Sequence, residues 1–214
     1  MIAADWVTIS ALATAGGTLV LALATFASVR SANRAARVAE RSLLAGLRPV
    51  LLPSKVDDPP QKVEFVDDKW FSAEGGQGIA EVEESVVYLA IPLRNVGSGI
   101  AVLHGWSFFV AEQLGSHLPR HRDPDQFVRL TRDLYVAAGG LGFWQGAFRD
   151  PASPEFAEAR DGIDRRRTLI VDVLYGDHEG GQRTITRFAL RPADSGRWLV
   201  TAALHWNLDR DDPR

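Results

Sequence analysis

The stretch WVTISALATAGGTLVLALATFASV, residues 6–29, contains no charged side chain. As a helix rising about 1.5 Å per residue, it would extend about 36 Å, enough to cross a hydrocarbon core of about 30 Å with some tilt. Four arginines follow between Arg30 and Arg41, with Glu40 as the only acidic residue among them. An uncharged run closed on one side by arginines predicts an N-terminal transmembrane helix over residues 1–29.

Three other interpretations of this run make different demands on the sequence. A cleaved signal peptide has positive charge ahead of its apolar region, whereas the only charged side chain before this run is Asp5. A buried core helix is an alternative because the run is rich in Ala, Thr, Ser and Gly and is moderately hydrophobic. An interfacial helix needs charge on one face within the run, and there is none. A single transmembrane span therefore fits the run better than these three alternatives.

The charge asymmetry around the run predicts its orientation. Residues 30–48 hold five arginines and one glutamate, a net charge of +4, and residues 1–29 carry a net charge of −1. Lys and Arg close to a span stay on the cytoplasmic side because they resist translocation. We therefore expect the N-terminus to lie outside and residues 30–214 to lie in the cytoplasm.

Small side chains recur along one side of the predicted span. They follow steps of three or four residues: Ala11, Ala15, Thr18, Ala22, Thr25 and Ser28. In lipid, small residues let helix backbones approach closely. One hypothesis is therefore a face for self-association or for docking a partner helix. The other is that Ala and Gly are simply frequent in this chain and the stripe arises by chance.

The arginines form a second stripe. Arg30, Arg34, Arg37 and Arg41 share one side of a helix because they are four, three and four residues apart. No Pro or Gly interrupts the segment before Gly46, which predicts a basic juxtamembrane helix or linker over residues 30–48. The orientation of the span in the membrane and the solvation of the helix are sufficient to explain the stripe. A further hypothesis is attraction to anionic lipid headgroups, which contributes about 1 kcal/mol per basic residue.

Nucleic acid is not an expected partner. The arginine stripe has no aromatic side chains among its members, and residues 49–214 carry a net charge of −6, which repels phosphate. The chain also has no cysteine, which excludes disulfides and thiolate metal sites.

Beyond Arg48, short apolar runs alternate with turn residues, a pattern typical of strands. The expected strands cover residues 48–53, 62–66, 85–95, 100–111, 167–175, 184–190 and 198–208. Residues 150–161 are the one segment with a helical pattern, and residues 57–60 and 115–126 are expected loops. Many strands with few helices favour an antiparallel β-sandwich of immunoglobulin-like type over residues 49–208, followed by a polar tail at 209–214.

The segment LRNVGSGIA, residues 93–101, separates two of these runs as a hairpin or a tight corner. With the Arg-Pro-apolar strand after the anchor, it resembles uncharacterised bacterial single-pass membrane proteins with a C-terminal immunoglobulin-like β-sandwich, which often carry L-x-N-x-G-x-G-x-A after a core strand. The resemblance implies the bacterial inner (cytoplasmic) membrane and no known activity. We expect Asn95, Gly97 and Gly99 to be structural, since they tolerate positive φ in a corner.

The histidines form no recognisable catalytic or metal-binding pattern. His117 and His121 lack the helix and the adjacent Glu of a zinc pair. The run 177–179, Asp-His-Glu, lies in a predicted hairpin loop and is expected to face water. His104 and His205 lie in strand patterns beside tryptophans, where packed or edge histidines are expected.

The remaining polar and glycine-rich segments also carry no motif. The aspartate clusters at 123–125 and 209–212 lack the ligand spacing, glycine turn and later Glu of a calcium loop. The segment GGLGFW, residues 139–144, is interpreted as a turn packed by its aromatic side chains. We therefore expect no enzyme activity, no metal and no cofactor.

The sequence thus predicts a membrane-anchored cytoplasmic binding or adaptor protein that recruits a protein partner at the membrane. The alternative is an oligomeric membrane pore or effector subunit in which the β-domain acts as sensor or gate; the Thr-rich small-residue stripe supports it. A hydrolase on a sandwich scaffold is a third class, for which the chain offers no nucleophile–base pair.

Overall fold

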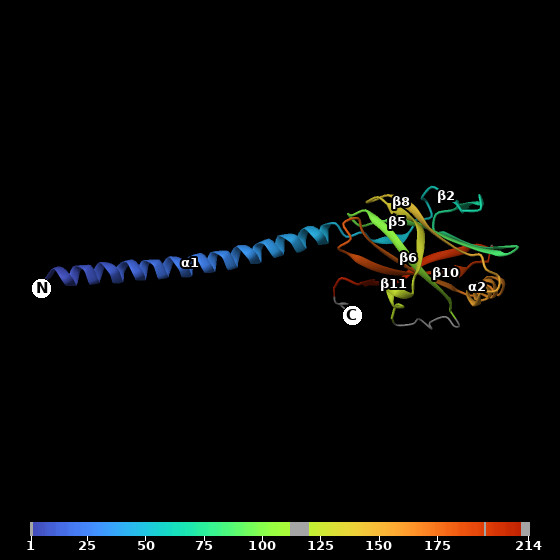
Figure 1. Ribbon diagram of the computed structural model, residues 1–214. Coiled ribbons are helices and arrows are strands. Elements are labelled where there is room, and N and C mark those ends of the chain that lie inside the picture. The colour runs from blue at the N-terminus through green and yellow to red at the C-terminus, as the bar shows by residue number, and fades with distance from the viewer. Residues whose placement is uncertain (1, 112–119, 195, 211–214) are drawn as a thin grey trace. The chain divides into compact units, whose positions relative to one another are not determined.

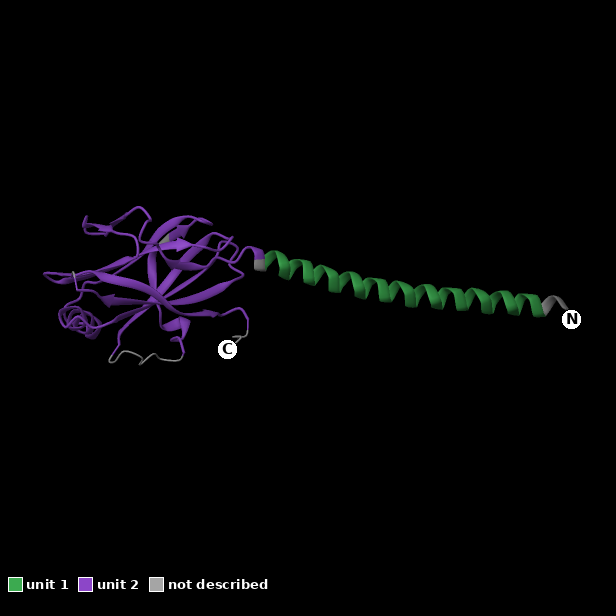
Figure 2. Cartoon of the chain, turned by 180° about the vertical axis from the view of Figure 1, so that it is seen from behind, with its two compact units in different colours: residues 1–45 green, residues 46–214 purple. Residues whose placement is uncertain are grey.

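The computed structural model describes residues 2–111, 120–194 and 196–210. The chain divides into two compact units, residues 1–45 and residues 46–214 (Figure 2). The first unit is helical: α1 (Ile2–Gly46) runs without a break through the predicted span and the predicted juxtamembrane segment. It ends at Gly46, three residues before Pro49, as the sequence predicts.

The long apolar helix expected at the N-terminus is confirmed. Residues Asp5–Leu44 form one candidate membrane span with a mean hydropathy of 1.9 in its most apolar window, and none of that window is buried against protein. This exposure disfavours the core-helix alternative, because a core helix buries its apolar face. Length and composition fit a membrane anchor or a signal sequence.

The second unit is built mainly from β-strands (Figure 1). Within the described residues these are β1 (Leu51–Pro53), β2 (Gln61–Glu64), β3 (Trp70–Ala73), β4 (Gln77–Glu83), β5 (Val86–Asn95), β6 (Ala101–Val110), β7 (Val128–Val136), β8 (Leu141–Phe148), β9 (Leu169–Asp177), β10 (Arg183–Pro192) and β11 (Trp198–Asn207). They are accompanied by a 3-10 turn, η1 (Pro124–Gln126), and one α-helix, α2 (Pro154–Asp164).

The strands pair antiparallel, which confirms the mainly antiparallel β-domain. β2 and β3 form a separate hairpin, and the others form one sheet in the order β1-β5-β4-β11-β10-β9-β6-β7, with β8 on the other edge of β5. β4 and β11 are joined by only two residue pairs, Gly78 with Trp198 and Gln77 with Leu199. The sheet therefore consists of two strand groups linked by a narrow bridge: β1, β4, β5 and β8 in one, β6, β7, β9, β10 and β11 in the other.

Both strand groups contribute to a single large core. Trp144 of β8 packs edge-on against Trp106 of β6, with ring centroids 5.2 Å apart, and Phe148 lies 5.3 Å from Trp106. Leu89 and Val171 join the same buried cluster from β5 and β9. β5 and β9 are buried on both faces, because residues on their other faces join two further apolar clusters, and their burial therefore does not alternate.

The connections match the sequence analysis in part. β9 and β10 form the expected hairpin, in which Arg183 pairs with Gly176. The segment after Asn95 is a corner rather than a hairpin, because β5 pairs with β1, β4 and β8 whereas β6 pairs with β7 and β9. The expected helix at 150–161 forms as α2, and η1 lies in the expected loop 115–126, of which residues 115–119 lie outside the described range.

The prediction of a turn over residues 139–144 is wrong for most of this segment. Only Ala138 and Gly139 form a turn, and β8 begins at Leu141. The strand glycines are required by packing, since a Cβ on Gly142 would lie 2.7 Å from Val136 and one on Gly146 would lie 2.8 Å from the Trp144 ring. Glycine here therefore marks close approach within a strand.

Candidate functional site

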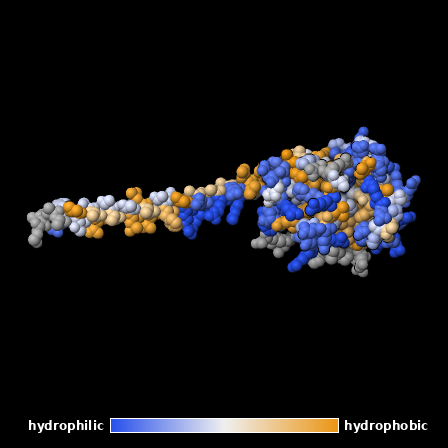
Figure 3. Space-filling view, viewed as in Figure 1, coloured by the Kyte–Doolittle hydropathy of each residue, from blue (hydrophilic) through white to orange (hydrophobic). Residues whose placement is uncertain are grey.

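The predicted arginine stripe is present on the helix beyond the apolar stretch. Arg30, Arg34, Arg37 and Arg41 are all exposed on α1. Figure 3 shows hydrophilic side chains gathered on one side of this part of the helix, with apolar residues on the other. The structure therefore places these four cations together, where they can contact headgroup phosphates along one line.

Four hydroxyl groups of the apolar stretch donate hydrogen bonds to backbone carbonyls of α1. Ser10 donates to the Val7 carbonyl at 2.9 Å, and Thr14 donates to Ser10 at 2.9 Å. Thr18 and Thr25 each donate to the carbonyl four residues earlier, at 2.8 Å. An unsatisfied polar group in hydrocarbon costs several kcal/mol, so these bonds make the polar members of the small-residue stripe compatible with lipid.

The spacing of the small-residue stripe continues beyond the stretch from which it was predicted, with Val29 in place of Ser28 and with Val29 and Leu43 as larger members. From Ala11 onward, alternating steps of four and three residues pass through Ala15, Thr18, Ala22, Thr25, Val29, Ala32, Ala36, Ala39 and Leu43. This 4-3 spacing is the heptad pattern of helices that pack along a common seam. The four arginines fall at the b and f positions of the same heptad, on the side opposite the seam.

The predicted corner residues lie where the β-domain begins. Asn95 is fully buried, and its side-chain oxygen accepts hydrogen bonds from the backbone N–H groups of Gly97 at 3.0 Å and Val50 at 3.2 Å. Its amide nitrogen donates to the carbonyls of Gly99 at 2.7 Å and Val136 at 3.0 Å. One side chain therefore links the start of β1, the corner and the end of β7 through hydrogen bonds.

The physical reason for the two corner glycines differs from the expected one. Neither Gly97 nor Gly99 has positive φ. A Cβ on Gly97 would instead overlap the Arg48 carbonyl, and one on Gly99 would overlap the Leu47 carbonyl. The glycines are needed because the segment that follows α1 passes directly over the corner.

Arg48 adds a second attachment at the same place. Its Nη1 donates to Asn207 Oδ1 at 2.8 Å and to Asp209 Oδ1 at 3.0 Å. Partial burial alone would raise the pKa of Asp209, but the hydrogen bonds and charge of Arg48 outweigh it and hold the pKa below its ordinary value. Asp209, at the start of the predicted polar tail, is thus tied to the start of the domain.

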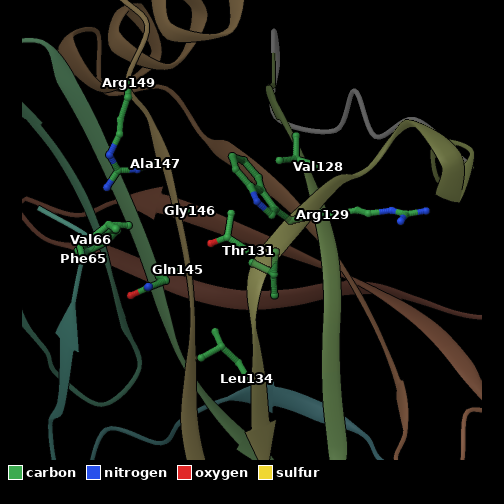
Figure 4. A pocket seen from close by; sticks show the side chains of 12 residues that line it. Phe65, Val66, Val128, Arg129, Thr131, Leu134, Gln145, Gly146, Ala147 and Arg149 are labelled. Carbon is green, nitrogen blue, oxygen red and sulfur yellow. The ribbon is translucent and has the colours of Figure 1, made fainter.

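A cleft that the sequence analysis missed lies between β7 and β8. It has a volume of about 130 Å³ (Figure 4). Leu130, Thr131 and Leu134 of β7 line it together with residues 145–147 of β8, and Trp106 reaches it from the core. β7 pairs with β6 and β8 pairs with β5, and no ladder joins β7 to β8 in the described residues. The cleft is therefore a gap between the facing edges of two strands that do not pair with each other.

The pairing of β7 with β6 is irregular beside this cleft. Between the pairs Leu103–Leu134 and Gly105–Arg129, β7 advances five residues while β6 advances two. The unpaired part of β7 includes Leu130 and Thr131, both of which line the cleft. Bulges of this kind re-aim side chains and end strand pairing, and they are frequent beside functional sites.

A buried ion pair on the other side of the sheet was also missed. Arg187 of β10 donates to Asp172 of β9 through Nε at 2.6 Å and Nη2 at 2.7 Å, and both residues are fully buried. The guanidinium lies 5.0 Å from the ring centroids of both Phe109 and Trp206. The signal in the sequence was a charged residue of opposite sign in the middle of each of two apolar strands. Complete burial of both side chains and their bidentate contact fit a structural role.

The histidines take separate places. His121 packs edge-on against Trp206 at 5.5 Å, His205 shares a hydrogen bond with Thr186 at 3.0 Å, and His178 lies 3.2 Å from Glu179. His104 is exposed at the irregularity in β6, and His117 lies outside the described residues. Across the described parts of the chain, no three His, Asp or Glu side chains gather as a metal site would require.

Comparison with family models, with curated proteins and with solved structures finds no match for this chain.

Proposed function

We propose that this chain is a single-pass, membrane-anchored binding protein that recruits a protein partner to the cytoplasmic face of the bacterial inner membrane. The observation that carries the proposal is α1, an unburied apolar helix that continues into a one-sided arginine stripe. Positive charge on that side favours an N-terminus outside and a cytoplasmic β-domain. The integral partner is membrane lipid, and the protein partner is to be identified.

We propose further that the β-domain is an immunoglobulin-like sandwich. Two groups of antiparallel strands that share one core support this assignment. The only cavity between strands that we interpret as functional is the cleft between β7 and β8. A scaffold with an open sheet edge and without a nucleophile–base pair in its described residues fits a binding role better than catalysis.

The first test asks whether the helix is retained as an anchor. Full-length protein with a C-terminal tag is expected to stay in the membrane after alkaline carbonate extraction, and its intact mass is expected to include residues 1–29. A soluble, shorter product would show that the run is a signal sequence and would overturn the proposal.

The second test asks for the partner. After mild detergent extraction, capture through the C-terminal tag is expected to yield one defined protein, at fixed stoichiometry on sizing. A matched protein that keeps residues 46–214 but carries an unrelated transmembrane helix separates partners of the β-domain from partners of α1. Reproducible isolation of the chain without any partner would contradict recruitment.

The alternative, an oligomeric pore or effector subunit with the β-domain as sensor or gate, is supported by the seam from Ala11 to Leu43. A seam of that length would bring several α1 helices together in the membrane. Vesicles loaded with dye and reconstituted with the full chain distinguish the two functions. A recruiting protein leaves the dye inside, whereas a pore releases it.

A further inference from the structure

Among the described strands β8 pairs only with β5, so its outer edge carries backbone groups that no described strand pairs. Asn95 exchanges hydrogen bonds with Gly139 and Gly140, so the odd-numbered residues of β5 direct their N–H and C=O groups toward β8. In the antiparallel register that pairs Leu89 with Gly146, the even-numbered residues of β8 return these bonds. The backbone groups of Phe143, Gln145 and Ala147 therefore point away from β5.

These outward groups face the cleft. Residues 145–147 line it, and β7, the strand on its far side, has left its own ladder at Leu130 and Thr131. Figure 4 shows Thr131 on one side of the cleft and Gln145 and Ala147 on the other. In addition, Gln145 Oε1 is buried without a hydrogen-bond donor. An N–H group placed beside β8 would supply that donor.

The size and lining of the cleft suit one apolar side chain. Its volume of about 130 Å³ is close to that of an apolar cavity of about 150 Å³ that accepts benzene. Trp106, which is 4% exposed, and Leu134 provide apolar walls. Val66 and Val128 are 83% and 53% exposed beside it, so the mouth is apolar as well.

The charged residues of the lining are both arginines. Arg149 extends along the β8 side, and Arg129 extends outward at the other strand (Figure 4). Arg149 lies 3.5 Å from Asp67, and this pair is solvent-exposed. No carboxylate lines the cleft among the described residues, although residues 49–214 are acidic as a whole. Local charge complementarity therefore favours an acidic ligand.

We propose that the cleft binds an extended acidic peptide segment of the recruited partner. The segment adds as a strand to the outer edge of β8, places one apolar side chain against Trp106, and directs an acidic residue toward Arg149. This inference rests on the proposed function and deepens it, because it assigns the site of recruitment and the chemistry of the partner. The main-chain bonds supply affinity and the anchor side chain supplies specificity.

The test uses the full-length protein in lipid nanodiscs and labelled, capped peptide pools of about seven residues. The pools carry Glu at both ends, mixed Thr, Val and Ser at the inner positions, and Leu, Phe, Gly or Asp at the centre. The Leu and Phe pools are expected to bind at least about tenfold more tightly than the Gly and Asp pools, a difference of about 1.4 kcal/mol. Equal binding by all four pools, or binding by none, would overturn the proposal.

Protein variants test the edge directly. Ala147→Pro removes one outward N–H without removing a bond to β5, so binding of the Leu pool is expected to fall about fivefold to tenfold while the thermal midpoint is maintained. Arg149→Gln is expected to weaken binding of the Leu pool and not of a matched Leu pool with Gln at both ends, and Arg191→Gln, at an exposed position of β10, is the control variant. Unchanged binding by Ala147→Pro contradicts strand addition.

The same variants separate this inference from the proposed function. If Ala147→Pro still captures the partner at full yield, recruitment stands and the cleft is not its site. If the edge instead pairs with a second copy, sedimentation of the wild-type chain shows a dimer that Ala147→Pro dissociates and that peptide does not, which also overturns the inference. Loss of both peptide and partner binding in Ala147→Pro is the expected result.

Discussion

At the scale of single residues, the buried pair of Asp172 and Arg187 is expected to be sensitive to substitution. Removing one partner leaves an uncompensated charge in the core, which costs about 3–5 kcal/mol. Arg187→Met is therefore expected to lower the free energy of unfolding by that amount. Denaturant titration of the full chain in detergent measures it. The double variant Asp172→Leu with Arg187→Met is expected to recover most of the loss, and a double variant as unstable as the single one would contradict this account.

The ion pair between Arg48 and Asp209 predicts an acid-sensitive contribution to stability. Because the pKa of Asp209 is lowered in the folded state, its contribution is present above the ordinary Asp value of 3.8 and is lost as pH falls through the lower folded value. Thermal midpoints between neutral pH and pH about 3 are expected to fall less steeply for Asp209→Asn than for the wild type. Parallel curves would show that the pair contributes nothing.

Gly99 is expected to tolerate no side chain. A Cβ there would overlap the Leu47 carbonyl, so Gly99→Ala must displace the segment between α1 and β1 and is expected to cost about 1–3 kcal/mol. Gly181→Ala is the matched control, since its Cβ would meet only Asp177, at 3.9 Å. Thermal unfolding of both variants measures the difference, and equal midpoints would refute the close-approach argument.

At the scale of elements, the seam on α1 makes a directional prediction. Ala15→Ile and Ala22→Ile place a branched side chain in the seam and are expected to reduce the signal of a membrane-association reporter carrying the span. Ala13→Ile lies off the seam and is expected to leave the signal unchanged. A monomeric span that none of the three variants affects would identify the stripe as a product of composition.

The strands differ in how well the sequence predicts them. β5, β6, β9 and β10 lie in the core and were predicted because burial on both faces requires long apolar runs. β7 and β8 were missed because β7 carries charges and β8 carries glycines, which local patterns assign to turns. β3 and β4 were also missed.

The candidate cleft could not have been predicted from local pattern. It depends on the register shift that frees Leu130 and Thr131 and on the approach of Trp106 from another strand. Asn95 was recognised as a corner residue, but the need for Gly97 and Gly99 arises from chain crossing, which no local pattern reveals.

At the scale of the whole molecule, the absence of cysteine allows a clean test of orientation. Thr201→Cys introduces a single thiol at an exposed position of β11. A membrane-impermeant maleimide is expected to label it in inverted membrane vesicles and not in intact spheroplasts. Replacing the four stripe arginines by Glu is expected to yield labelling in both preparations, because the charge asymmetry that orients the span is removed. Labelling of the unmodified stripe protein in intact spheroplasts would contradict a cytoplasmic domain.

Because α1 is a continuous helix, its length along the axis is fixed. From Val29 to Gly46 the helix rises about 25 Å, which limits how far from the end of the apolar stretch the β-domain can begin. A flexible tether of equal residue number would let that distance fluctuate, whereas a helix fixes it. If the chain recruits a partner as proposed, that partner is confined to a thin layer along the bilayer. Its later encounters become collisions in a plane, so two weakly interacting proteins held in this layer meet far more often than in bulk solution.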